Sequence, residues 1–348
     1  MLPEENFIAE INGRKTSLYT LKNNLGLSAQ ITNYGAALVG VFAPDKEGRF
    51  EDVVLGYENI QDYASDPYFH GAIVGRFANR IGHGKFTING QEHQLNRNHG
   101  PHALHGGPMG FGRMVWEAET RGHQLQLSYL SPDGEEGYPG NLRVKVTYSL
   151  NDDNALVIDY LAETDKPTVI NLTNHAYFNL GNTPKREISH HILWLNASQF
   201  TPKSPEGIPN GEFQDVQGTP MDFTSAKPIG RDIASSHPQL VLGRGYDHNF
   251  VLNHEKQSLT KAAEVFDPAS RRCLEVLTTM PGVQFYTADY LGHGSPGKEG
   301  YVYQPRDGFC LETQFFPDSP NKPQFPSTLL NPGDIYSHQT VYRFSVKG

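Results

Sequence analysis

The chain has 348 residues and a formal net charge of −9, and it contains no block of basic residues. Nucleic acids and anionic membranes are therefore not expected partners. A chain of this length can bury about three quarters of its unfolded surface, so its core does not need disulfides or metals for stability. Both cysteines, Cys273 and Cys310, lie in apolar strand-like runs, which is typical of buried thiols in a reducing compartment.

The first six residues have neither a basic segment nor an apolar one, and no apolar run is long enough to span a bilayer. We expect a cytoplasmic protein, unless a signal peptide has been removed. The chain has 35 glycines and 24 prolines, and turn signals recur along it. Only residues 58–63 and 230–236 have helical features. This pattern predicts a large all-β protein.

The N-terminal part predicts a meander of short strands. The predicted strands cover residues 17–21, 27–35, 37–42 and 52–56. Residues 84–91 predict a hairpin, because Asn89-Gly90 is one of the strongest short hairpin signals. Strands at 124–130 and 142–150 are joined by the acidic loop 131–140, which lacks the alternating ligands of a calcium-binding loop.

Residues 71–81 combine an apolar run with two arginines and an asparagine, and glycines at 71, 75 and 82 permit close backbone approach. Asn79 and Arg80 are therefore candidate donors to a polar ligand. The alternative is that Arg76 and Arg80 form surface ion pairs.

The loop at 96–113 carries His99, His102 and His105 at intervals of three. That spacing suits metal ligands on a helix, but the surrounding glycines and prolines exclude a helix, so a metal site is not expected. A glycine-rich loop with histidines is more typical of ligand binding, and His105, just before Gly106, is the best placed.

Residues 168–181 alternate like a strand that places His175 and Tyr177 on one face. A hydrogen-bonded core histidine is the alternative interpretation of His175. Residues 182–240 have few long apolar runs, and we expect them to form an excursion over a sheet edge. Asp247 lies two residues after Gly245 and is a candidate for binding a ligand hydroxyl or for capping a turn. Gln284 lies in an aromatic strand.

Glu312 lies late in the strand-like stretch 309–314, between apolar residues and just before a Pro/Asp/Ser/Asn turn. A buried carboxylate costs several kcal/mol unless it is paired or hydrogen-bonded. Taken alone, the stretch fits a solvent-facing glutamate on an edge strand better than a functional one.

Seven of these segments, in this order, resemble the aldose 1-epimerase (galactose mutarotase) family. They are Gly75–Ile81, Leu104–Gly107, Ser131–Gly140, Asn171–Leu180, Tyr246–His248, Pro281–Tyr286 and Leu311–Gln314. The resemblance implies one domain over residues 1–348, folded as a large antiparallel β-supersandwich with an open sugar site. It also implies that His175 is the general acid, Glu312 the general base, and Asn79, Arg80, His105, Tyr177, Asp247 and Gln284 the sugar-binding residues.

The implied reaction opens a sugar hemiacetal and closes it on the other face of C1. Opening removes a proton from the C1 hydroxyl and adds one to the ring oxygen, which a base and an acid on opposite sides can do. We expect the acid protonated and the base ionised in the starting complex, each stabilising the other, and no metal or organic cofactor is needed. The partner is a small aldose, and the protein is expected to be a monomer or homodimer.

Three alternatives remain open at this point. A hexose-6-phosphate 1-epimerase would need an added cationic pocket for the phosphate. A non-catalytic sugar-binding module would tolerate loss of the acid or the base. A glycoside hydrolase would pair the carboxylates of Glu312 and Asp247.

Overall fold

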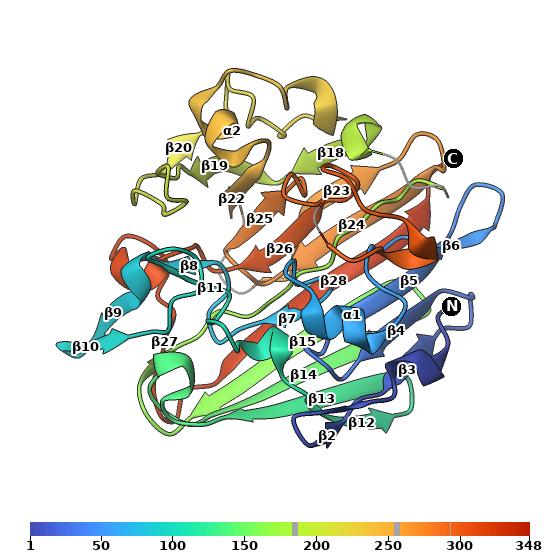
Figure 1. Cartoon of the computed structure of the whole chain (residues 1–348). Coiled ribbons are helices and arrows are strands. Elements are labelled where there is room, and N and C mark those ends of the chain that lie inside the picture. Colours follow the sequence, from blue (N-terminus) through green and yellow to red (C-terminus); the bar gives the residue numbers. More distant parts are fainter. Residues whose placement is uncertain (183–186, 254–257, 293) are drawn as a thin grey trace.

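The computed structural model describes residues 1–182, 187–253, 258–292 and 294–348 (Figure 1). Its largest sheet has nine antiparallel strands, in the order β12 (Glu117–Arg121), β13 (Gln124–Ser131), β14 (Leu142–Leu150), β15 (Ala155–Thr164), β28 (Tyr336–Val346), β24 (Arg272–Thr278), β23 (Thr260–Phe266), β18 (Ile192–Leu195) and β21 (Lys227–Pro228). The last strand of the chain, β28, thus lies in the middle of this sheet, as Figure 1 shows.

Two smaller antiparallel sheets accompany the large one. The first has the order β20 (Gln214–Asp215), β19 (Ala197–Thr201), β22 (Asp247–Leu252), β25 (Gly282–Tyr286) and β26 (Cys310–Gln314). The second is β3 (Leu18–Lys22), β4 (Ser28–Thr32), β5 (Leu38–Pro44) and β6 (Phe50–Asp52).

Short strand pairs and single turns complete the described structure. The pairs are β1 (Glu10–Ile11) with β2 (Arg14–Lys15), β7 (Ile73–Val74) with β17 (Thr173–Asn174), β8 (Arg80–Ile81) with β11 (Ala103–Leu104), β9 (Lys85–Ile88) with β10 (Gln91–Gln94), and β16 (Thr168–Val169) with β27 (Leu329–Leu330). The α-helices are α1 (Ile60–Ser65) and α2 (Pro238–Gly243), and the 3₁₀ turns are η1 (Glu4–Phe7), η2 (Gly82–Gly84), η3 (Phe111–Arg113), η4 (Glu135–Gly137), η5 (Ile188–His190), η6 (Ile229–Arg231), η7 (Lys298–Gly300) and η8 (Ser319–Asn321).

The all-β prediction is confirmed, and one continuous core holds the sheets together. Ile31 of β4, Val146 of β14 and Phe285 of β25 all belong to it. In β14, buried residues alternate with exposed or half-buried ones along the strand, so one face of this strand packs on the core and the other faces solvent. In the part of the chain that the structure describes, no helix has the length and apolarity needed to cross a membrane.

Strands β25 and β26 are buried on both faces, and this places the site. Val283, Phe285 and Leu311 contribute to the core. Gln284 and Glu312 alternate with them and are register partners across the two strands. Because successive side chains point to opposite faces, Gln284 and Glu312 face away from the core side by side.

Several local predictions are confirmed. Strands β9 and β10 pair in the register expected for a two-residue turn, and Asn89 and Gly90 both have positive φ, as a type I′ hairpin requires. The loop 131–140 does connect β13 to β14. Helix α1 matches the stretch 58–63 to within two residues and begins after Asn59, whose side chain accepts from the Asp62 N–H as an N-cap.

Other predictions are wrong in detail. The strand expected at 52–56 ends at Asp52, whose side chain accepts from the N–H groups of Val41 and Val54 and so replaces the ladder. The stretch 230–236 forms no α-helix beyond the single turn η6, and α2 begins instead at Pro238, a residue favoured at a first helical position.

The stretch 168–181 is not one strand, and 182–240 is not only an excursion. Backbone N–H groups of Ile170, His175 and Phe178 donate to three separate segments, at Thr328, Ala72 and Phe309. Changing partners interrupt the ladder, so only β16 and β17 form. Within 187–240, β18 joins the nine-stranded sheet and β19 joins the five-stranded sheet, while residues 183–186 lie outside the described ones.

Candidate active site

A cavity of about 270 Å³ brings together residues from segments that lie far apart in the sequence. Seven of the eight predicted site residues line it, and the lining is Pro67, Tyr68, Phe69, Asn79, Arg80, His99, Leu104, His105, His175, Tyr177, Asp247, Tyr286, Tyr290 and Glu312. Gln284 is not among these residues. It lies behind Asp247, to whose Oδ1 its Nε2 donates at 2.7 Å.

His175 and Glu312 are the closest pair of candidate acid and base. His175 Nε2 lies 3.7 Å from Glu312 Oε2, and the side chains are only 6% and 3% exposed. Glu312 Oε2 is buried without a hydrogen bond within the described part of the chain. Both side chains face the cavity, so the solvent-facing interpretation of Glu312 is wrong. On its other nitrogen, His175 Nδ1 contacts Cys310 Sγ at 3.7 Å.

Burial acts on both members of this pair in the same sense, because it disfavours charge. It raises the pKa of Glu312 well above its usual range, and the negative charge of Asp247 adds to this. It also lowers the pKa of His175 to about 4. Without a bound sugar, burial therefore favours the neutral forms of both side chains, with the titratable proton of the pair on Glu312. The pairing of a protonated histidine with an ionised glutamate is an expectation for the sugar complex, whereas without the sugar two buried charges cost more than they recover at 3.7 Å.

Asn79 and His105 hold each other through reciprocal hydrogen bonds. The Asn79 N–H donates to His105 Nδ1 at 3.2 Å, and the His105 N–H donates to the Asn79 carbonyl at 3.0 Å. Since Nδ1 accepts, the neutral ring carries its proton on Nε2 and can donate to a ligand. Burial, with the charges of His175 and Arg80, holds the pKa of His105 well below its usual value.

The two arginines of the 71–81 stretch have separate positions. Arg76 is buried and donates to Ser131 Oγ, the Pro139 carbonyl and the Gly140 carbonyl, so it fixes the 131–140 loop. Arg80 lines the cavity, and its backbone carbonyl accepts from the Asp318 N–H in the turn after β26. The surface-ion-pair interpretation therefore fails for Arg76, and Arg80 is available to the cavity.

Asp247 is held by an amide and a cation. Besides Gln284, it accepts at Oδ2 from Lys203 Nζ at 2.6 Å. Burial alone would raise the pKa of Asp247, but the charges of Lys203 and Arg80 outweigh burial and hold it below its usual range. Asp247 is therefore an ionised acceptor at the cavity wall.

Aromatic side chains form much of the remaining wall. The Tyr177 ring faces the cavity, while its hydroxyl donates to the Tyr68 carbonyl. Tyr68, Phe69, Tyr286 and Tyr290 were not predicted. In the sequence these aromatic residues lie close to the chosen motifs, but this position alone does not show whether an aromatic side chain lines a cavity or packs in the core.

Among the described residues, two groups of side chains have the composition of a metal site, and in both a hydrogen bond opposes metal binding. The first is His105, His175 and Glu312, and the second is His190, His191 and Asp267. In the first, the hydrogen bond to His105 Nδ1 leaves a proton on the Nε2 that faces the cavity. In the second, His191 Nε2 accepts from the Leu180 N–H at 3.0 Å. Its Nδ1 must then carry the proton, whereas a ligand nitrogen needs a free lone pair.

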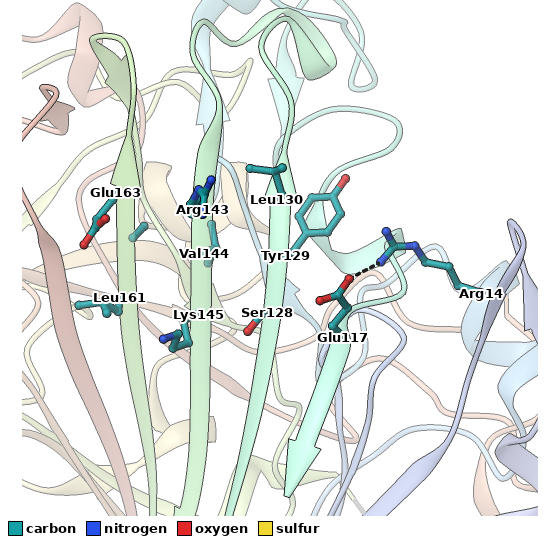
Figure 2. A pocket seen from close by; sticks show the side chains of 11 residues that line it. Arg14, Glu117, Ser128, Tyr129, Leu130, Arg143, Val144, Lys145, Leu161 and Glu163 are labelled. Carbon is teal, nitrogen blue, oxygen red and sulfur yellow. Dashed lines mark ion pairs between the residues drawn. The ribbon is translucent and has the colours of Figure 1, made fainter.

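A larger hollow, of about 550 Å³, lies on the solvent face of β12–β15 (Figure 2). Its charged side chains include Arg14 and Glu117, which are 53% and 80% exposed and lie 3.8 Å apart. Exposed pairs of this kind have little effect on stability. Among the residues that line this hollow, no titratable group is buried, so the smaller cavity is the better candidate active site.

Comparison with known proteins identifies the family of the chain. The family model described as aldose 1-epimerase matches residues 17–343. Human galactose mutarotase is 41% identical over 334 residues, covering 96% of this chain and 95% of that protein, and aldose 1-epimerase of Escherichia coli is 37% identical over 336 residues, covering 96% of each. Among solved structures, the aldose epimerase homologue from C. elegans has a TM-score of 0.88 at 31% identity, covering 96% of this chain and 100% of that one.

The chain belongs to the aldose 1-epimerase family. It is an isomerase that interconverts the α and β anomers of aldoses.

Proposed function

We propose that the cavity binds an aldohexose such as galactose or glucose, with His175 as general acid and Glu312 as general base. Asn79, Arg80, His105 and Asp247 bind the sugar hydroxyls and the ring oxygen, and the Tyr177 ring packs on the sugar. Gln284 acts by orienting Asp247, to which it donates.

In the reaction, Glu312 takes the proton of the C1 hydroxyl while His175 gives a proton to the ring oxygen. The C1–O5 bond breaks, and C1 becomes the aldehyde of the open chain. After rotation about C1–C2, the same two groups return the protons in reverse and the ring closes on the other face. The protein ends with the protons with which it began.

The observation that carries this proposal is the separation of 3.7 Å between His175 Nε2 and Glu312 Oε2 at the buried wall of the cavity. The pair needs one proton in total, which lies on Glu312 in the free protein. In the complex, hydroxyls of the sugar donate to Glu312, and together with the Arg80 guanidinium they stabilise the form in which the proton lies on His175.

The test follows the optical rotation of freshly dissolved α-galactose. Wild type accelerates its decay to equilibrium, and Glu312→Gln or His175→Asn lowers kcat by about 10²–10⁴-fold, because general acid–base catalysis contributes that much. Glu117→Gln, in the hollow on the outer sheet face, is the matched control and keeps wild-type rates. If either site variant is folded and keeps full kcat, the assigned role is wrong.

We also propose that the protein works in hexose metabolism in the cytoplasm, as a monomer or homodimer. Cys273 and Cys310 are both buried free thiols, which supports a reducing compartment. Comparing rates on glucose and glucose 6-phosphate tests the substrate, since preference for the phosphate would favour a hexose-6-phosphate 1-epimerase.

A further inference from the structure

Lys203 is a buried cation directly behind the cavity wall. It follows β19, and its side chain is only 9% exposed. Its Nζ donates to Asp247 Oδ2 at 2.6 Å and to the Asp247 carbonyl at 2.7 Å. A buried ammonium costs several kcal/mol unless it is paired, so this contact pair is what keeps the side chain in place.

The backbone of Lys203 is fixed independently of its side chain. The Gln239 side chain in α2 accepts from the Lys203 N–H at 2.9 Å and donates to the Lys203 carbonyl at 3.0 Å. Lys203 also forms an isolated bridge with Pro209. The ammonium group is therefore presented to Asp247 from a rigid turn.

Together with Gln284, Lys203 engages both oxygens of the Asp247 carboxylate. Gln284 Nε2 donates to Oδ1, and Lys203 Nζ donates to Oδ2. Two donors on different oxygens fix the plane of the carboxylate. Because Asp247 lines the cavity, the remaining lone pairs of these oxygens can accept hydrogen bonds from a ligand there.

Lys203 also changes the charge that Glu312 experiences. Ionised Asp247 opposes ionisation of Glu312, whereas the Arg80 charge favours it. The Lys203 ammonium, which is bonded to Asp247, offsets the negative charge of that carboxylate. The other titratable or charged groups that face or influence Glu312 are His105, His175, Tyr177, Cys310 and Tyr342.

We propose that Lys203 is a positioning residue of this site, which orients the Asp247 carboxylate toward the sugar hydroxyls and offsets its negative charge. This inference rests on the proposed role of Asp247 in binding the sugar. It extends the site to a residue that does not line the cavity.

The test compares Lys203→Met with Lys227→Met. Lys227 is a matched control, because its Nζ also donates to one carboxylate, Asp232 Oδ2, and one backbone carbonyl, that of Pro220, each at 2.7 Å. It lies in β21, outside the cavity lining. Lys203→Met raises KM about 10-fold or more with a smaller change in kcat, because it disorders a binding group. Lys227→Met keeps the wild-type KM.

The second readout is the pH profile of kcat/KM. Its upper limb reports loss of the proton from Glu312, and Lys203→Met moves this limb to higher pH because the negative charge of Asp247 is no longer offset. Lys203→Arg retains the cation and keeps the limb in place. Should Lys203→Met not fold, Lys203→Gln, which keeps a polar side chain and removes the charge, carries the same pH test.

A double variant separates this inference from the proposed function. In an Asp247→Asn background, Lys203→Met changes KM by less than about 3-fold, because its effect runs through Asp247. A folded Lys203→Met protein with wild-type KM and pH profile overturns the inference, even where Asp247→Asn alone is inactive. If Asp247→Asn itself keeps wild-type activity, the proposed role of Asp247 fails and the inference fails with it.

Discussion

Glu312 is a residue that the stability of the fold alone would not favour at its position. The residue is 2% exposed, and its carboxyl lies beside an ionised aspartate, with Oε2 lacking a hydrogen bond among the described residues. Packing would favour an amide or an apolar side chain here, because a buried carboxyl must either keep its proton or lose solvation as an anion. A residue that lowers local stability in this way is typical of a functional site, where it is retained for its chemistry.

A stability prediction follows from the raised pKa of Glu312. Above the pKa of the unfolded chain, about 4.3, the unfolded state loses this proton while the folded state retains it. Wild-type stability therefore falls as pH rises toward the folded pKa, by up to about 1.4 kcal/mol per pH unit. Glu312→Gln has no such proton, so its stability relative to wild type increases from pH 5 to pH 8. Urea unfolding at both pH values measures this, and a pH-independent difference would contradict it.

At the scale of elements, the site depends on close approach between two loops. Gly106 has a φ of +86°, and a Cβ there would lie 1.9 Å from the Gly75 carbonyl oxygen. Glycine is therefore required twice, for its backbone conformation and for space. This approach aligns β8 with β11 and so brings Arg80 next to His105.

We therefore expect Gly106→Ala to displace the loop that carries His105. Activity should fall at least about 10-fold, because a displacement near 1 Å is enough to disturb a catalytic geometry. Gly134→Ala is the matched control, since Gly134 also has a φ of +86° but nothing within 4 Å of its Cβ position. Polarimetry and thermal unfolding of both variants separate backbone strain from displacement, and equal activity losses would argue against the close approach.

At the scale of the whole molecule, side chains from the nine-stranded, five-stranded and four-stranded sheets share one core. We propose that residues 1–348 form a single domain, and we expect one calorimetric unfolding transition. Its van't Hoff and calorimetric enthalpies should agree, as they do for one cooperative unit. Two resolved transitions would instead indicate separate units.

The sequence predicted features that depend on local geometry or on recognisable motifs. The Asn89-Gly90 hairpin is local, and the motif residues that line the cavity came from the family resemblance. Lys203 could not be found this way, because its importance depends on Asp247, which is distant in sequence. The interrupted pairing between 168 and 181 was missed for the same reason, since alternation does not reveal that successive backbone groups have different partners.

The central position of β28 has a consequence for how the protein is made. Because β15 and β24 both pair with β28, the large sheet stays split into two parts, each with an open edge, until the ribosome has released residues 336–346. Open edges of this kind invite pairing with other chains. Folding to the active form therefore cannot finish before β28 is available, and truncation shortly before this strand should yield aggregates instead of partly active enzyme.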